Sequence, residues 1–369
     1  MFLDQPASRL NYPRRSSPLG RGWEFIRSTA TRVERRFATL LSAIVFVIGA
    51  GLVAWDYSLL LVNPANYAWF WVGMLLCFLA AVSVGLRPTT GAGRHMLVLL
   101  ALGFVLYLPY IFRSPAKPIF NDELFHYQTV RLILEQGSIS LPITTYPIPG
   151  EFPGLEFITL PLMNLSGLPL EIAARLVTLT VHMLIPLLAY MIARGLGLGR
   201  RTGFVAAMVY IANTSYYFFH SVFSYETVGI LFVLTAWALL ARRARRGLRR
   251  TDLWLLIAVL FAVAVTHHVS SYMLALSLAI AWFVLKIRNR KERNKSTGRY
   301  LGLLATLSVV FPVFWLFLGT ERALHYLTTS ISLRLQTIVR TIFAEQSTTR
   351  RLFKESPLPL LERVVDFAY

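Results

Sequence analysis

The sequence has 369 residues, of which 56% are hydrophobic and only 15% are charged. A soluble domain usually contains roughly 25% charged residues, so too few charges remain to cover a surface that faces water. This composition excludes a soluble enzyme and a disordered chain, and the single cysteine excludes a disulfide scaffold and a cysteine-based metal site. The net charge of +19 does not indicate a nucleic-acid partner, because the basic residues crowd into short loops between apolar runs.

Apolar runs long enough to cross a bilayer recur along the chain, since about 20 residues span its hydrocarbon core. The sequence therefore predicts an all-α, polytopic membrane protein with about nine transmembrane helices. The predicted spans cover residues 38–57, 67–86, 96–113, 171–193, 202–219, 222–241, 252–268, 270–287 and 300–319.

Lysine and arginine are distributed unequally between the two sides of this arrangement. One side receives 26 of the 37 basic residues, and the other receives 11. By the positive-inside rule the richer side is cytoplasmic, which makes residues 1–36 a cytoplasmic basic tail. We expect a multi-pass protein of the cell membrane whose active face is extracytoplasmic.

Two segments stand out on the outer face, one within the transmembrane domain, which we place at residues 37–319, and one after it. Residues 114–170 form the one long loop between spans, and they contain apparent helices at 121–136 and 153–166. Long ordered loops on a rigid scaffold often carry function, so this loop is the predicted catalytic loop. Residues 320–369 form an extracytoplasmic or interfacial tail, and we expect that the chain has been cut short there or needs a partner.

The outer loop opens with two adjacent acids, Asp122 and Glu123, at the start of a helix that Asn121 would cap. Acids in the first turn of a helix are common, because their negative charge interacts favourably with the positive end of the helix dipole. A pair at the membrane surface also fits catalysis, since a carboxylate accepts a hydroxyl proton or holds a divalent ion against phosphate. His126 lies four residues after Asp122 and would contact it.

Glu226 strengthens the catalytic interpretation. The apolar run that follows it has only 14 residues, so the helix must recruit residues 222–226 to span, which places Glu226 one turn inside its outer end. Ionisable residues at that depth are costly and usually functional, although a carboxylate so near the surface also reaches the headgroups.

Cationic groups on the outer face are few. His267 and His268 sit at a polar break between two predicted spans, and Arg175 lies about one turn into another. Imidazole and guanidinium groups donate to phosphate oxygens, so these three are the candidate phosphate-binding residues. The alternatives are a satisfied histidine pair at the interface and an arginine that snorkels.

Four motifs on the outer face resemble those of the GT-C superfamily of polytopic glycosyltransferases, which includes protein O-mannosyltransferases and lipid A aminoarabinose transferases. They are NDELFHY at 121–127, FPGLEF at 152–157, HSVFSYE at 220–226 and THHVSSY at 266–272. The sequence departs from the family pattern in having three spans before the acidic loop, where many relatives have one.

This resemblance implies transfer of a sugar from a polyprenyl-phosphate donor, embedded among membrane lipids, to a glycan, lipid or protein acceptor of the cell envelope. The implied catalytic residues are Asp122, whose role Glu123 would share, and Glu226. We expect inverting transfer with Asp122 as general base. His126, Glu156 and Tyr225 fall within the matched motifs, and we assign them to the substrate-binding loop.

The cofactor requirement stays open, with a divalent cation, magnesium or manganese, compatible with the acidic pair. Two other functions also remain. One is a lipid or solute transporter coupled through Glu226, although transporters usually bind near the membrane midplane within repeated halves. The other is a non-catalytic subunit of a membrane complex.

Overall fold

The computed structural model describes the backbone of residues 18–60, 67–114, 117–138, 148–243, 249–288 and 295–317, with a few residues between 328 and 337. Within these ranges all regular structure is helical, which confirms the predicted all-α class. Most of the 320–369 tail, residues 1–17 of the basic tail and residues 139–147 of the outer loop lie outside the described residues.

The chain divides into two compact units, Met1–Thr90 and Gly91–Tyr369. The first unit contains α1 (Pro18–Leu60) packed against α2 (Ala68–Gly85). The helices approach closely at Gly49 and Gly73, where an added Cβ on either would lie under 3 Å from the other's carbonyl oxygen. Small residues permit such contacts between transmembrane helices. Asp56 accepts the Phe70 backbone N–H at 2.7 Å, which joins the end of α1 to the beginning of α2.

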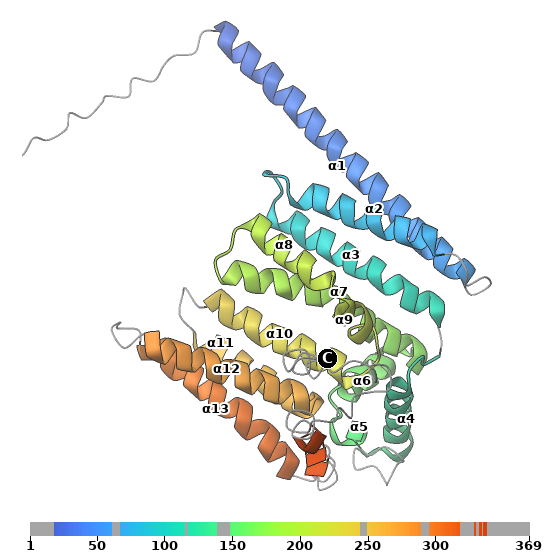
Figure 1. Ribbon diagram of the computed structural model, residues 1–369, viewed down its shortest axis with the longest axis vertical. Coiled ribbons are helices and arrows are strands. Elements are labelled where there is room, and N and C mark those ends of the chain that lie inside the picture. Colours follow the sequence, from blue (N-terminus) through green and yellow to red (C-terminus); the bar gives the residue numbers. More distant parts are fainter. Residues whose placement is uncertain are drawn as a thin grey trace, which may run out of the picture. The chain divides into compact units, whose positions relative to one another are not determined.

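The second unit contains the remaining helices (Figure 1). They are α3 (Ala92–Arg113), α4 (Asn121–Gln136), α5 (Ile148–Glu151), α6 (Glu156–Ser166), α7 (Leu170–Gly195), α8 (Arg200–Ile211), α9 (Thr214–Phe219), α10 (Tyr225–Arg243), α11 (Arg250–Thr266), α12 (His268–Arg288) and α13 (Lys295–Phe317).

Seven helices of the described chain are long and apolar enough to cross a membrane, rather than the nine predicted. The two that fall short are the predicted spans at 202–219 and 252–268. The first is divided into α8 and α9 by a turn at Ala212 and Asn213, and the second is α11, which has 17 residues. At 1.5 Å per residue, α11 extends about 25 Å, slightly less than a hydrocarbon core.

Both short elements nevertheless run the length of a neighbouring helix. Gly203 in α8 lies beside Arg194 at the end of α7. Phe223, which follows α9, donates to Glu123, and Glu123 pairs with Arg175 near the start of α7. Asp252 in α11 pairs with Arg243 at the end of α10, and the other end of α11 reaches the turn before α6.

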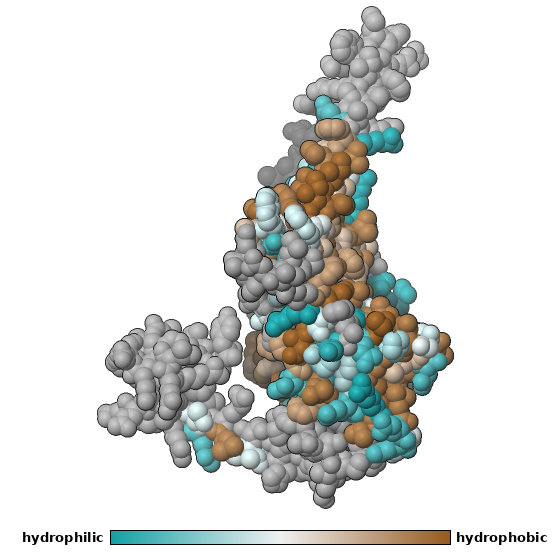
Figure 2. Space-filling model, turned by 90° about the vertical axis from the view of Figure 1, so that its right-hand side faces the viewer, coloured by the Kyte–Doolittle hydropathy of each residue, from teal (hydrophilic) through white to brown (hydrophobic). Residues whose placement is uncertain are grey.

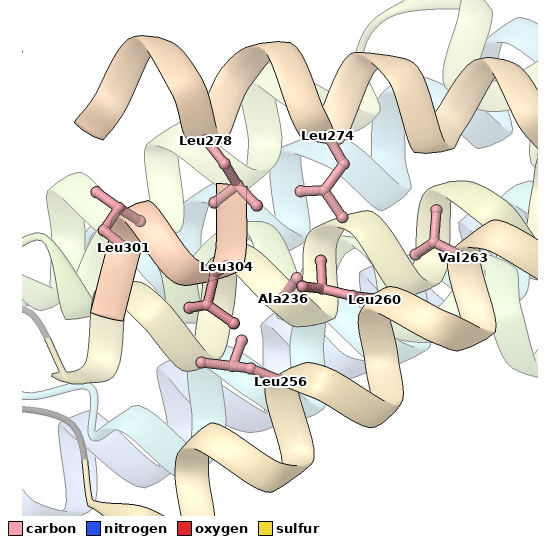
Figure 3. Packing of buried hydrophobic residues seen from close by; sticks show 8 residues of the cluster. All are labelled: Ala236, Leu256, Leu260, Val263, Leu274, Leu278, Leu301 and Leu304. Carbon is pink, nitrogen blue, oxygen red and sulfur yellow. The ribbon is translucent and has the colours of Figure 1, made fainter. Parts of the chain in front are cut away.

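The helices α10 to α13 share a hydrophobic core (Figure 3). Its buried side chains are Ala236, Leu256, Leu260, Val263, Leu274, Leu278, Leu301 and Leu304. Other large hydrophobic side chains remain exposed, and they cover much of the face in Figure 2. In a water-soluble protein such surface would have to be covered, whereas in a bilayer it faces lipid.

The helices of the outer loop gather at one end of the second unit, beside the beginnings of α7 and α10 (Figure 1). The predicted helix at 121–136 is confirmed as α4, which ends at Gly137 in a left-handed conformation (φ 62°). The helix predicted at 153–166 begins three residues later, because residues 153–155 form a turn. This turn reaches α11, where Gly154 N–H donates to the Val265 carbonyl at 3.2 Å.

Candidate active site

Glu123 ties the start of α4 to two other elements of the second unit. Its buried carboxylate accepts the backbone N–H of Ile119 at 2.6 Å and of Phe223 at 2.9 Å, and it also accepts the Tyr110 hydroxyl. Glu123 also accepts the Phe120 backbone N–H at 3.4 Å, so the helix is capped at Phe120 and not at Asn121 as predicted. The contact with Phe223 joins α4 to the turn that precedes α10.

Arg175 completes this cluster from α7. Its guanidinium lies 3.4 Å from the Glu123 carboxylate and donates to the carbonyls of Ser114 and Lys117 at 2.9 and 2.6 Å. It also stacks over the Tyr110 ring, with 4.5 Å between Cζ and the ring centroid. Arg175 is therefore buried among protein partners near the start of its helix, at the depth predicted.

His126 forms a second link between α4 and the same turn. Its Nδ1 lies 2.8 Å from Glu156 Oε1, and its Nε2 accepts the Tyr225 backbone N–H at 3.3 Å. Both side chains are buried, with exposed fractions of 1% for His126 and 0% for Glu156. The structure thus brings together all three residues assigned to the substrate-binding loop. It does not pair His126 with Asp122, as the helical spacing had suggested.

Glu226 lies in the first turn of α10, directly after Tyr225 and nearer the helix start than predicted. Residues 222–224 precede the helix, and the Thr227 hydroxyl bonds to the carbonyls of Phe219 and Val222, both at 2.7 Å. The Glu226 carboxylate is partly exposed and lies 3.8 Å from His267 Nε2.

The predicted polar break between spans is confirmed. His267 ends α11 and His268 begins α12. His267 Nδ1 accepts the Ser270 backbone N–H at 3.3 Å, which directs Nε2 toward Glu226. Burial lowers the pKa of His267 to about 3, so it is neutral at physiological pH.

Close packing holds the FPGLEF turn against this break. A Cβ added to Gly154 would lie 2.7 Å from Thr266 Cα, so the approach requires glycine. The neighbouring Phe152 ring lies 5.1 Å from the His268 ring, measured between centroids. His268 is itself buried, and its Nδ1 has no hydrogen-bond partner among the described residues.

Asp122 differs from every other member of the site because its side chain is exposed. It is near enough to Glu226 for their charges to interact. Two side-chain contacts fix this proximity, since Glu123 holds Phe223 and His126 holds Tyr225. The beginnings of α4 and α10 are therefore held close together, with Glu226 beside His267 at the end of α11.

His182 was not predicted from the sequence as a residue near the site. It is buried in the middle of α7 against Tyr216 and Ser221. His220, which opens the HSVFSYE motif, lies 3.0 Å from the Tyr210 hydroxyl. Burial lowers the pKa of His220 to about 4. A histidine within an apolar helix is a detectable signal, but the partners of His182 come from α9 and the turn after it, and they cannot be read from spacing.

A protein-only metal centre is not visible in the described part of the chain, where no three His, Cys, Asp or Glu side chains converge. Asp122 and Glu226 would supply at most two carboxylate ligands. Magnesium bound between them would take its other ligands from phosphate and water, as it does in many phosphate-binding enzymes.

Residues 151–316 match the model of the dolichyl-phosphate-mannose-protein mannosyltransferase family. Residues 151–316, just under half of the chain, are therefore similar to this GT-C glycosyltransferase family. With its membrane-spanning helices, the protein is a membrane glycosyltransferase that uses a polyprenyl-phosphate sugar, which confirms the predicted class of enzyme. No curated protein and no solved structure matches the chain.

The mannosyltransferase domain covers only part of the candidate site. Glu156, Glu226, His267 and His268 lie within the matched residues, whereas Asp122 and His126 precede them. The assignment of Asp122 therefore rests on its position beside Glu226 and on the acidic motif that resembles the GT-C pattern.

Proposed function

We propose that the protein transfers a sugar from a polyprenyl-phosphate donor to an acceptor hydroxyl at the extracytoplasmic face of the membrane, with inversion at the anomeric carbon. The acceptor oxygen attacks this carbon while Asp122 takes the hydroxyl proton. The bond between the carbon and the phosphate oxygen breaks, and polyprenyl phosphate leaves with the electron pair.

One observation carries this proposal. Two hydrogen bonds, from Phe223 to Glu123 and from Tyr225 to His126, hold the helix of Asp122 beside Glu226. A solvent-exposed carboxylate next to a half-buried one suits proton transfer at an interface, where the acceptor comes from water and the donor tail stays in lipid.

The distribution of charge supports the extracytoplasmic location. The site lies at the beginnings of α7 and α10, whereas Arg194 and Arg243 lie at the opposite ends of these helices. The basic loops follow those opposite ends, and the positive-inside rule assigns them to the cytoplasm. This orientation requires nine crossings, with α8 and α9 together forming one and α11 another.

The remaining site residues divide into two groups. We propose that Glu226 orients the acceptor or a divalent ion, and that His267 and His268 donate to the leaving phosphate. Glu123 and Arg175 already hold several protein partners, so in our proposal they support the site by fixing α4 and do not touch the substrate.

The family description makes a mannosyl donor the first to test, with a protein acceptor before a glycan or lipid. Replacing Asp122 with Asn should lower transfer by about 100-fold or more, since a positioned general base contributes about 10²–10⁴-fold. Glu135→Gln is a matched control, because Glu135 is an exposed acid at the other end of the same helix.

The measurement is transfer of labelled sugar by purified variants in lipid vesicles, with donor binding measured in parallel. Donor binding by the Asp122→Asn variant should stay close to that of the wild type. An Asp122→Asn variant that transfers sugar at the wild-type rate would refute the proposed role.

A further inference from the structure

The His126 imidazole joins three elements of the site. His126 belongs to α4, Glu156 begins α6, and Tyr225 begins α10. We propose that His126 and Glu156 are a positioning pair that sets the placement of Glu226 relative to Asp122. This inference rests on the proposed function and goes beyond it, because neither residue acts on the substrate.

The hydrogen bonds define which imidazole nitrogen carries the proton. The Tyr225 backbone N–H donates to Nε2, and a nitrogen that accepts a hydrogen bond in this way carries no proton. The proton of the neutral ring is therefore on Nδ1, which donates to Glu156 Oε1 at 2.8 Å. Glu156 thus stabilises the one tautomer that is able to receive Tyr225.

Burial makes this choice of tautomer consequential. Both side chains are excluded from solvent, so water does not replace a lost partner. In the other tautomer, an Nε2–H would face the Tyr225 N–H, and Nδ1 would present a lone pair to the carboxylate. Both contacts would then be repulsive.

Few residues separate His126 and its partner Tyr225 from the two proposed catalytic carboxylates. Asp122 lies one helical turn before His126 on α4, and Glu226 directly follows Tyr225. The ring also packs edge-on against Tyr225, with 4.8 Å between centroids. A shift of the Tyr225 backbone would therefore move Glu226 away from Asp122 without altering either carboxylate.

Replacing His126 with asparagine or with glutamine tests the two ring nitrogens separately. The amide of asparagine corresponds in position to Nδ1, and that of glutamine corresponds to Nε2. His126→Asn can still donate to residue 156 but does not reach Tyr225, whereas His126→Gln can accept the Tyr225 N–H but loses the link to residue 156. Both changes are made in a Glu156→Gln parent, so that no buried carboxylate is left without a partner.

If the pair acts by positioning, the glutamine variant should keep kcat within about tenfold of the parent, the loss expected for about one neutral hydrogen bond. The asparagine variant should lose about 100-fold, because a small misplacement of reacting groups has an effect of this size. KM for polyprenyl-phosphate-mannose should change little in either variant. A kcat for the asparagine variant equal to or above that of the glutamine variant would overturn the inference.

A second comparison applies if either double variant does not fold. Glu156→Gln retains an oxygen that accepts from Nδ1, whereas Glu156→Leu has a similar volume but no acceptor. The Glu156→Leu variant should show a kcat at least about tenfold below that of the Glu156→Gln variant. Equal values would contradict the positioning role. Failure of the proposed function is recognised separately, because the wild-type protein itself would then transfer no sugar.

Discussion

The two neighbouring acids of the site, Asp122 and Glu123, lie in opposite environments, and this difference distinguishes the proposed catalytic residue from the residue that stabilises the fold. Asp122 is exposed, whereas Glu123 is buried and accepts hydrogen bonds from several groups. The sequence predicted that both acids open a helix, because its local signals identify that turn. It could not predict which acid faces inward, since Phe223 is 100 residues from Glu123 along the chain.

Replacing Glu123 with Ala should therefore destabilise the protein. Removing one member of a buried ion pair leaves the other charge unpaired, which costs about 3–5 kcal/mol. Thermal unfolding in detergent should show a clearly lower Tm for Glu123→Ala, and little change for Glu135→Ala. The Glu123→Ala/Arg175→Ala double variant should lose less than the sum of the single losses. A purely additive result would mean that the two side chains do not stabilise each other.

Stability should also depend on pH through His220. Its pKa is about 4 in the folded protein, below the ordinary value of 6.5, so between these values the unfolded chain binds a proton that the folded chain does not. The stabilisation is complete above about pH 6.5 and is lost as the pH falls toward 4. Between pH 7 and 5 the Tm of the wild type should fall more than that of His220→Gln. Parallel curves for the two proteins would refute this assignment.

At the scale of elements, the sequence predicted most helices but not where they break. The turn between α8 and α9 contains Asn213, whose side chain accepts the Ser215 backbone N–H at 2.8 Å. Asparagine followed by Thr and Ser is a helix-start signal, yet the surrounding apolar residues favoured one continuous span. Long periodic runs such as α7 left no such ambiguity.

The turn before α6 depends on one close contact between elements. An alanine at Gly154 would place its Cβ against Thr266, so Gly154→Ala should separate this turn from the end of α11. Such overpacking costs about 1–3 kcal/mol, and the displaced loop should reduce transfer as well as Tm. Gly93→Ala is the control, because no heavy atom lies within 4 Å of its added Cβ. If Gly154→Ala behaves like Gly93→Ala, the close packing is not required.

At the scale of the whole molecule, composition and the positions of charge were sufficient to predict a polytopic membrane protein, whereas the class of enzyme was predicted from the resemblance of four motifs. The family match confirms the class, and the described helices confirm a membrane-spanning protein. The division after Thr90 could not be predicted, because hydropathy identifies spans but does not show which of them pack together. The burial of Glu156 against His126 was unpredictable for the same reason.

The proposed topology of nine crossings predicts that Arg200, Arg249 and Lys286 lie on the same, cytoplasmic side, and that Glu135 lies on the other. If α8–α9 and α11 did not cross, Arg249 would lie opposite Arg200. Because the chain has one cysteine, Cys77→Ser provides a background for a single cysteine at each position. An impermeant thiol reagent applied to intact cells should label only position 135. Labelling at position 249 would contradict the nine-span topology.

The most direct test of the central claim follows labelled sugar from a polyprenyl-phosphate donor in vesicles that contain only the purified protein and an acceptor. The account predicts that label appears on the acceptor with inverted anomeric configuration, that polyprenyl phosphate is released in equal amount, and that Asp122→Asn abolishes most of both. Movement of the labelled donor across the bilayer without any glycosidic product would contradict the account, because it would identify a transporter and not a transferase.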